Sequence, residues 1–388
     1  MLELFLLLLP LAAFSGWLIG RRDVNKQQEC NDFSLDYLQG LSFLLNDQQD
    51  KALDIFVRML ESNSEVVEIH LALGNLFRKQ GEVERSIRIH QNLIARPTLK
   101  TEQRSQALYE LAQDYMKAGL LDRAEKLFLE ILDKKKFTLL ALKNLLDIYQ
   151  QEKDWLKAIQ IAERLDYMST DKYNNTQSHF YCELADNAIR DNDFKTARIM
   201  IQKAIFTDKS NARASILEGD LYSHDGKYKI ALKSYQKVAN SDADFLSEVI
   251  DKIIQCYVFL GREEDMTKYF VTVYKSNPNI IVSASFSDFI FSSGNKDLLG
   301  LFIRRLSEIK TTDELLGVIA LVGKRPDLLS QNMDNILISI QNTMHQKTKY
   351  KCVNCGFRAK SIHWNCPGCH QWGCVKPSLN TTESSLVH

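Results

Sequence analysis

Hydrophobic residues follow two patterns along the chain: a continuous run at the N-terminus and a periodic body behind it. Residues 2–20 are apolar apart from Glu3, and Ser15 is the only other polar side chain among them. At ~1.5 Å per residue a helix of this length spans about 28 Å, close to the ~30 Å hydrocarbon core of a bilayer. The pattern predicts a transmembrane helix over residues 1–20 and a juxtamembrane linker over residues 21–32.

The charges around this run predict its orientation. Arg21 and Arg22 follow the run directly, Lys26 comes shortly after, and no basic residue precedes it. By the positive-inside rule the N-terminus lies outside the cytoplasm and the chain after Arg21 lies inside it. A cleaved signal peptide is the alternative. Such a peptide carries a basic segment before its apolar run and a small-x-small cleavage site after it, and this sequence has neither.

A period of 34 residues organises residues 33–278. This period, with its pattern of small and aromatic residues, is that of the tetratricopeptide repeat, a helix–turn–helix unit. Small residues let the two helices of a unit approach closely, aromatic residues fill the space beside them, and neighbouring units stack. The sequence therefore predicts an all-α solenoid. The residues that recur at this spacing are Gly40 and Gly74, Phe43 and Phe77, Ala52 and Ser86, Tyr115 and Tyr149, Ala124 and Ala158, and Ala197 and Ala231.

Turn signals separate the two predicted helices of several repeats, because glycine adopts the backbone conformations that a tight turn requires. Two repeats are longer than the period, with extra residues around 96–102 and 169–176. We expect these extra residues to form longer loops between repeats. The glycines at the predicted turns are Gly81, Gly119, Gly226 and Gly261.

The repeat pattern weakens beyond Pro278. Residues 279–345 are expected to form degenerate repeats or a capping bundle that joins the array to the C-terminal segment. Residues 378–388 are polar and are expected to form a disordered tail. The helices predicted between Pro278 and the C-terminal segment cover residues 286–291, 296–309, 314–322 and 332–344.

Composition agrees with a folded, mainly helical protein, since 45% of residues are hydrophobic, 25% are charged, and only 6 Pro occur in 388 residues. The net charge is zero, but from residue 340 onward six basic residues stand against one acid, Glu383. This basic segment is either a solvated surface or a docking face for the body of the chain, a partner or anionic lipid headgroups. The basic residues are Lys347, Lys349, Lys351, Arg358, Lys360 and Lys376.

Two C-x-x-C pairs near the C-terminus predict a metal site. Cys352 and Cys355 form the first pair, and Cys366 and Cys369 form the second. Each short turn directs two sulfurs toward one point, so four thiolates can surround an ion as a tetrahedron. Two disulfides are the alternative in an oxidising compartment, whereas the predicted cytoplasmic location keeps thiols reduced. The predicted metal-binding domain covers residues 346–377.

The remaining cysteines are not expected to hold the ion. Cys30, Cys182 and Cys256 lie far apart in helical patterns and are interpreted as small buried hydrophobic residues. Cys374 lies five residues after Cys369 and is interpreted as a spare thiol, because four cysteines already complete a tetrahedron.

One iron or zinc ion is expected, because four thiolates suit zinc and equally an iron ion of the rubredoxin type. The paired knuckles resemble those of rubredoxin, with a shorter loop between them. His363 and His370 flank the site and could contact the ligands from outside. A structural role is favoured, since so short a module cannot build an adequate core and the metal would supply folding free energy. The aromatic residues expected around the site are Tyr350, Phe357, Trp364 and Trp372.

The sequence contains no catalytic signature: no phosphate-binding glycine loop, zinc-protease helix or nucleophile elbow occurs. His70, His90 and His179 occupy helical positions and are interpreted as surface or core residues. His179 and Cys182 share one face of a helix, but a catalytic pair needs a third group to orient the base. A non-enzymatic protein is therefore predicted.

Specific motifs carry a resemblance to a known family. The chain combines a span ending in Gly20-Arg21-Arg22, repeats containing Gly74-Asn75-Leu76-Phe77-Arg78 and Ile87-Arg88-Ile89-His90-Gln91, and a terminal rubredoxin-like knuckle pair. This combination resembles the lipopolysaccharide assembly protein B family of Gram-negative bacteria. The resemblance covers essentially the whole chain and is loosest over residues 279–345.

The resemblance implies a non-enzymatic, single-pass adaptor of the inner membrane. Such an adaptor presents the committing deacetylase of lipid A synthesis to the membrane AAA protease FtsH, with other lipopolysaccharide assembly proteins as further partners. It also implies Cys352, Cys355, Cys366 and Cys369 as metal ligands. A membrane-tethered redox module of the rubredoxin type, or a metal-sensing module, on a repeat scaffold is the main alternative. Nucleic-acid binding through the basic knuckles is disfavoured by the neutral net charge and the predicted anchor, and homo-oligomerisation stays open.

Overall fold

The computed structural model describes residues 38–40, 42–43, 48–62, 67–134, 136–276, 286, 289–290, 294, 300, 319, 337 and 349–377. The predicted transmembrane helix, juxtamembrane linker and tail, and most of residues 279–345, lie outside the described residues. Among the helices of the described part, none combines the length and the apolar composition that crossing a membrane requires.

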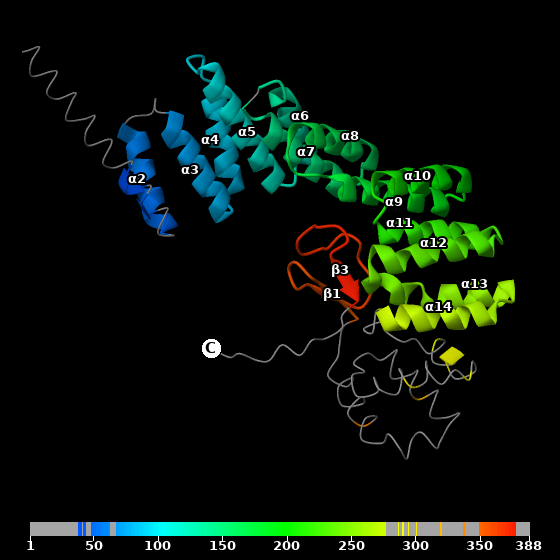
Figure 1. The fold of residues 1–388 in the computed structure, drawn as a ribbon. Coiled ribbons are helices and arrows are strands. Elements are labelled where there is room, and N and C mark those ends of the chain that lie inside the picture. Colours follow the sequence, from blue (N-terminus) through cyan, green and yellow to red (C-terminus); the bar gives the residue numbers. More distant parts are fainter. Residues whose placement is uncertain are drawn as a thin grey trace, which may run out of the picture. The chain divides into compact units, whose positions relative to one another are not determined.

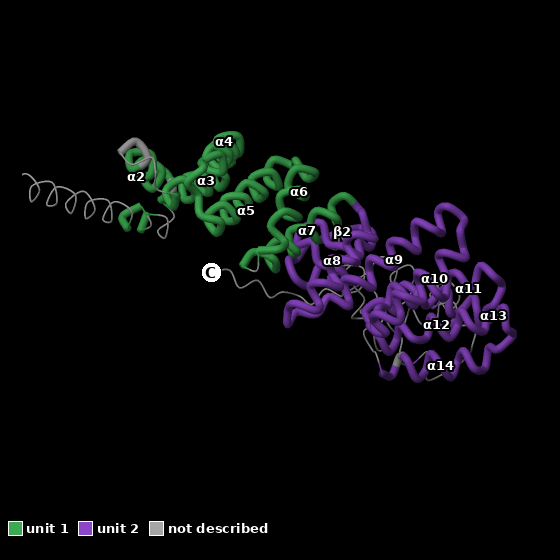
Figure 2. The backbone as a smooth tube through the Cα atoms, turned by 90° about the horizontal axis from the view of Figure 1, so that it is seen from above, with its two compact units in different colours: residues 1–152 green, residues 153–388 purple. Residues whose placement is uncertain are grey.

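The chain divides into two compact units, residues 1–152 and residues 153–388 (Figure 2). In the first unit each helix packs against the next one along the chain. Most of its buried residues are small or apolar and recur along each helix at intervals of three or four, as an amphipathic helix requires, and its buried acidic and basic residues include His70, His90 and Asp114. The helices are α2 (Gln49–Ser62), α3 (Val67–Gln80), α4 (Val83–Ile94), α5 (Thr101–Lys117), α6 (Leu121–Ile131) and α7 (Thr138–Glu152).

The second unit continues the same arrangement and ends in a small β-sheet. Helices α9 to α14 stack one after another, and a short 3-10 helix, η1, packs against α12, α13 and the sheet (Figure 1). The elements are α8 (Trp155–Met168), α9 (Asn174–Arg190), α10 (Phe194–Thr207), α11 (Ala212–His224), α12 (Tyr228–Ser241), η1 (Ala243–Glu248), α13 (Ile250–Leu260) and α14 (Glu263–Ser276). Together with the first unit they confirm the predicted all-α tetratricopeptide-repeat fold.

Glycine beside a ring explains how the two helices of a repeat approach so closely. A Cβ atom added to Gly219 would lie 2.3 Å from Cε1 of Tyr235, a distance that real side chains do not tolerate. The equivalent glycine of the second repeat, Gly74, is covered in the same way by His90, with 2.4 Å to Nε2. The ring therefore fills the space that the missing side chain leaves, as the repeat pattern predicts.

The predicted turns adopt the left-handed backbone conformation. Gly119 and Gly226 have φ of +75° and +74°, and two non-glycine residues at repeat-equivalent positions, Lys153 and Asn192, have φ of 58° and 60°. The left-handed conformation at the end of a helix satisfies its last carbonyl groups. Position within the repeat, rather than residue type, thus decides this conformation, which is why the sequence pattern missed the turns without glycine.

Candidate metal centre

The C-terminal module is built on a three-stranded antiparallel sheet. Strand β1 (Tyr350–Cys352) pairs with both β2 (Arg358–Ala359) and β3 (Val375–Pro377), so the strand order is β2-β1-β3. Cys352 ends β1 and lies opposite Val375 in the register of β1 and β3. The sheet therefore fixes the position of the first thiol of the module.

Two knuckle turns place the other predicted thiols. After the first knuckle Gly356 has φ of +77°, and its N–H donates to the carbonyl of Cys352 at 3.1 Å. After the second knuckle His370 has φ of +56°, and its N–H donates to the carbonyl of Cys366 at 2.8 Å. His370 thus repeats the role of Gly356 and closes its turn. The other flanking histidine, His363, packs edge-on against Phe357, with ring centroids 6.0 Å apart.

The structure brings five thiols together at these turns. Sulfur–sulfur distances are 3.7 Å between Cys352 and Cys369, 3.6 Å between Cys355 and Cys366, and 3.5 Å between Cys352 and Cys374. The sulfurs of Cys352, Cys366, Cys369 and Cys374 all lie within 4.8 Å of one another. Cys374, which the sequence pattern left as a spare, is therefore part of the cluster.

This donor set fits a metal ion. Zinc–thiolate bonds of ~2.3 Å in a tetrahedron place neighbouring sulfurs about 3.8 Å apart, which agrees with the observed separations. All seven cysteines of the described part are free, and Cys182 and Cys256 are buried in helices as predicted, whereas Cys30 lies outside the described residues. The cluster is a metal site of thiolate type.

Backbone amides favour the thiolate form at the first ligand position. Burial acts to raise the pKa of Cys352, but the backbone N–H groups of Cys355 and Asn354 outweigh it and lower the pKa to about 6. The N–H of Cys355 lies 3.4 Å from the Cys352 sulfur. Since only a deprotonated thiol binds a metal ion, this arrangement prepares Cys352 for binding at neutral pH.

The module packs against the repeats of the second unit through Trp372. The indole stacks on His179 of α9 with ring centroids 5.2 Å apart. It also meets Phe180 of α9 edge-on at 5.7 Å and Trp155 of α8 at 5.9 Å. These rings form one aromatic cluster, so Trp372 anchors the module to the N-terminal parts of α8 and α9.

A second indole, Trp364, extends this contact to α11 and η1. Phe245 of η1 lies 4.9 Å from it between ring centroids, and the guanidinium of Arg213 lies over its face at 5.6 Å. Arg213 is almost fully buried and forms ion pairs with Glu183 and Asp186 of α9. An arginine that is paired on one side and stacked on the other links α9, α11 and the module.

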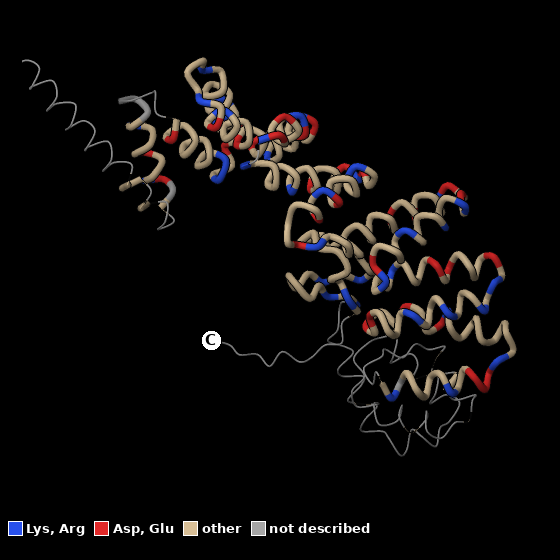
Figure 3. Tube along the Cα trace, turned by 45° about the horizontal axis from the view of Figure 1, so that its top comes forward, with Lys and Arg blue, Asp and Glu red and all other residues tan. Residues whose placement is uncertain are grey.

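Polar contacts complete the docking surface. Lys376 of β3 forms ion pairs with Asp242, which directly precedes η1, and with Asp244 of η1, at 2.9 Å and 2.8 Å. The hydroxyl of Tyr350 donates to Glu248 at 2.8 Å. At least part of the basic C-terminal segment therefore docks on the body of the chain. Elsewhere along the described helices of this unit, basic and acidic positions are interspersed (Figure 3).

Two known protein families match the two parts of the fold. Residues 350–377 match the rubredoxin metal binding domain, and residues 69–104 match the tetratricopeptide repeat. The C-terminal part of a tetratricopeptide-repeat protein from Cytophaga hutchinsonii is a similar solved structure, with a TM-score of 0.39 and 13% identity over 68% of this chain and 98% of that one.

Relatives of similar length decide the family. Lipopolysaccharide assembly protein B of Escherichia coli strain K12 is 38% identical over 97% of this chain and 98% of its own length. The chain belongs to the lipopolysaccharide assembly protein B family. The protein of the same name from Haemophilus influenzae is 33% identical over 98% of this chain and 99% of its own length. Membership confirms the resemblance that the motifs indicated.

Three buried side chains of the repeats, a serine, a histidine and an aspartate, are in contact. Their arrangement is not that of a Ser-His-Asp catalytic triad. Ser86 Oγ lies 2.7 Å from Asp114 Oδ1, while His90 Nδ1 lies 2.6 Å from Asp114 Oδ2. A triad needs the hydroxyl on the histidine rather than on the carboxylate. All three side chains are buried, and Arg78 also pairs with Asp114 at 2.7 Å. The group is a polar network that joins two repeats.

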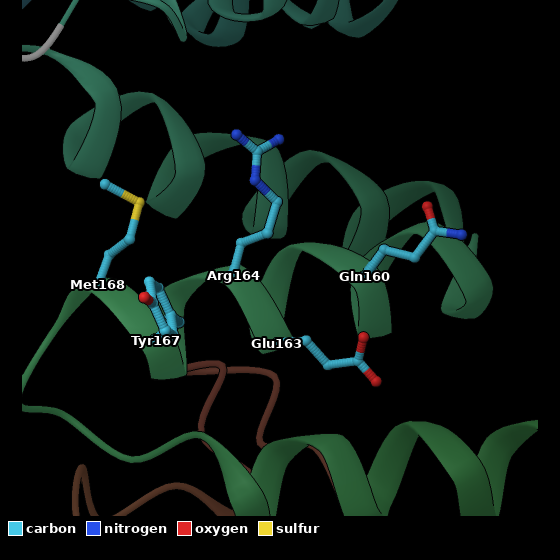
Figure 4. A pocket seen from close by; sticks show the side chains of 5 residues that line it. All are labelled: Gln160, Glu163, Arg164, Tyr167 and Met168. Carbon is cyan, nitrogen blue, oxygen red and sulfur yellow. The ribbon is translucent and has the colours of Figure 1, made fainter.

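A hollow on the surface of α8 has a volume of about 290 Å³. Figure 4 shows that the five side chains lining it project from one helix. Active sites gather convergent polar groups from several elements. The side chains that line this hollow come from α8 alone. Its lining residues are Gln160, Glu163, Arg164, Tyr167 and Met168.

Acid is expected to weaken the second unit through His179. Burial, with the nearby charge of Arg213, lowers the pKa of His179 from 6.5 to about 3. Between these pH values the unfolded chain binds a proton that the folded chain does not, so stability falls as the pH falls. From pH 7 to pH 5 this loss amounts to about 2 kcal/mol.

Denaturant unfolding of zinc-saturated protein at the two pH values measures this loss. His179→Phe is the matched control, because it keeps a ring against Trp372 and removes the titrating group. Any effect of pH on the metal site is common to both proteins. We expect the variant to lose about 2 kcal/mol less than the wild type, and equal losses would show that His179 is protonated without cost in the fold.

Proposed function

We propose that this protein is a non-enzymatic adaptor of the inner membrane that regulates lipopolysaccharide synthesis. In this role it promotes degradation of the committing deacetylase of lipid A synthesis by the membrane protease FtsH, and it brings other lipopolysaccharide assembly proteins together. The observation that carries the proposal is the 38% identity to Lipopolysaccharide assembly protein B of Escherichia coli over 97% of the chain. A repeat scaffold suits the role, because stacked helix pairs present an extended surface for peptides or helices.

The proposed metal site consists of Cys352, Cys355, Cys366 and Cys369 with one iron or zinc ion. Two knuckles and sulfur separations near those of a tetrahedron support this set. These residues would hold the ion, and their shared binding would tie the two knuckles together. Metal analysis of the purified chain distinguishes iron from zinc.

The knuckles connect the metal site with the docking surface. Trp364 comes two residues before Cys366, and Trp372 comes three residues after Cys369. The N–H of Gly373 donates to the carbonyl of Trp364 at 2.7 Å, and both indoles lie against the ring of His179. An ordered second knuckle therefore holds both indoles in position, and the indoles in turn pack against α8, α9 and η1. We propose that the docked module maintains the shape of the client-binding repeats.

A single N-terminal span over residues 1–20 is proposed to place the repeats on the cytoplasmic face of the membrane. Confinement to the membrane raises the effective concentration of an adaptor near membrane-bound partners. The apolar composition of residues 2–20 and the basic residues Arg21 and Arg22 support this topology.

Depletion of the protein in its native host tests the function. The half-life of the lipid A deacetylase should lengthen, and lipopolysaccharide should accumulate, because the enzyme is no longer presented to the protease. Removing the protease as well should not lengthen the half-life further if the protein and the protease act in the same pathway. A half-life that is unchanged by depletion would reject the adaptor role for this chain.

A further inference from the structure

We infer that Cys374 is an alternative ligand of the metal site, able to replace Cys355. The module then carries two overlapping sets of four thiolates, which share Cys352, Cys366 and Cys369. This inference rests on the proposed binding of a metal ion by the knuckle cysteines and adds a fifth residue to that site.

Sulfur geometry is the first support. The Cys374 sulfur lies 3.5 Å from that of Cys352, as close as neighbouring ligands of one ion. With Cys352, Cys366 and Cys369 it forms a group whose sulfurs all lie within 4.8 Å of one another. Cys355 contacts the same group, with its sulfur 3.6 Å from that of Cys366. Five thiols thus surround a position that takes four.

The two exchangeable thiols are held by different parts of the module. Cys355 belongs to the first knuckle and is exposed at the surface. Cys374 is buried, directly precedes β3, and accepts a hydrogen bond at its carbonyl from the N–H of Val353 at 2.9 Å. The sheet therefore keeps Cys374 beside Cys352 whether or not Cys355 is present.

Exchange requires a small and balanced change. In the structure the Cys374 thiol donates to the carbonyl of Gln371 at 3.1 Å. On exchange this hydrogen bond breaks, the Cys374 thiol loses its proton to water, and its sulfur bonds to the ion. The bond from the ion to Cys355 breaks, and the Cys355 thiolate takes up a proton. The number of metal–sulfur bonds and the total charge stay the same.

The consequence is a site that survives loss of its most accessible ligand. Exposed thiols are the first to react with oxidants and electrophiles, and a four-cysteine site normally loses its ion when one ligand reacts. A buried fifth thiol at ligand distance would let this module keep its ion and its fold.

Cobalt and zinc binding to the full-length chain and to three variants tests the inference. The variants are Cys355→Ser, Cys374→Ser and Cys355→Ser/Cys374→Ser, and affinities are measured by competition with a chelator. Cys355→Ser/Cys256→Ser is the matched control, since it removes the same number of thiols but takes the second from a repeat helix.

We expect Cys374→Ser to change the affinity for zinc and cobalt by less than about threefold in the otherwise wild-type chain. In the Cys355→Ser background the same substitution should lower this affinity by more than about 100-fold. Cobalt bound to Cys355→Ser should keep the charge-transfer absorbance of four thiolates, and the matched control should resemble Cys355→Ser. If Cys374 acted only from outside the ligand shell, Cys374→Ser would lower the metal affinity by the same factor in the wild type and in Cys355→Ser. That result, or a three-thiolate spectrum for Cys355→Ser, would overturn the inference.

Alkylation provides a second readout if the double variant does not fold. In zinc-loaded Cys355→Ser, mass spectrometry should find Cys374 protected from iodoacetamide until a chelator removes the zinc. Equal labelling before and after chelation would also overturn the inference. If the wild type binds neither cobalt nor zinc, the proposed metal site itself fails, and this outcome is distinct from the others.

Discussion

Replacing Trp372 with alanine is expected to release the metal module from the repeats while the module keeps its ion. The indole contacts His179, Phe180 and Trp155, and none of these belongs to the module. Truncation of a large aromatic residue in a packed site costs about 3 kcal/mol. Here this cost would shift the equilibrium between docked and undocked module roughly 150-fold toward the undocked form. Hydrogen exchange of the backbone amides of α9 should therefore increase.

The result is interpretable only if the ion stays bound, so metal content is measured on the same sample. Val353→Ala is the matched control, because Val353 is an apolar residue of the same module that is 70% exposed. This control should leave exchange in α9 unchanged. Unchanged exchange in Trp372→Ala would mean that the contacts of Trp364, Tyr350 and Lys376 hold the module without the Trp372 indole.

Loss of the ion is expected to unfold the module and leave the repeats helical. The buried core of the module consists of only six residues, and half of them are cysteines. Structural zinc contributes about 10–16 kcal/mol to the folding of small zinc-binding peptides, far more than this core can supply. Cys352→Ser/Cys366→Ser should therefore be cleaved by protease within residues 350–377 while its helical circular dichroism remains. The six core residues are Tyr350, Cys352, Ala359, Cys366, Cys374 and Val375.

Chelation of the wild type provides the control for this variant. Added zinc should restore protease resistance to the chelated protein but not to Cys352→Ser/Cys366→Ser. If residues 350–377 resist protease equally with and without the ion, the docking contacts with α8, α9 and η1 are sufficient to fold the module, and its metal has another role.

Local sequence patterns predicted the repeats because the decisive contacts lie within one unit. Gly219 and Tyr235 occupy fixed positions of one repeat. The 34-residue pattern therefore already specifies the contact through which the two helices pack. The second repeat carries a different ring beside its glycine. His90 takes the place of the aromatic residue there, and its contact with Asp114 of the next repeat could not be read from the pattern.

The docking of the module could not be predicted, because it joins residues far apart in the sequence. The ion pairs of Lys376 with Asp242 and Asp244 depend on the path of the chain through the repeats. The charge imbalance after residue 340 indicated only that a docking face was one alternative. The clustering of Cys374 has the same origin, since the pairing of β1 with β3 brings it next to Cys352.

The most direct test of the account is the half-life of the lipid A deacetylase in a depleted host that expresses Cys352→Ser/Cys366→Ser at the level of the wild type. The variant must first be shown to lack metal and to keep its helical repeats. We predict that the half-life remains as long as in the depleted host, because an unfolded module no longer supports the repeats. A half-life restored to that of the wild-type complement would contradict the account, since client control would then require neither the ion nor the docked module.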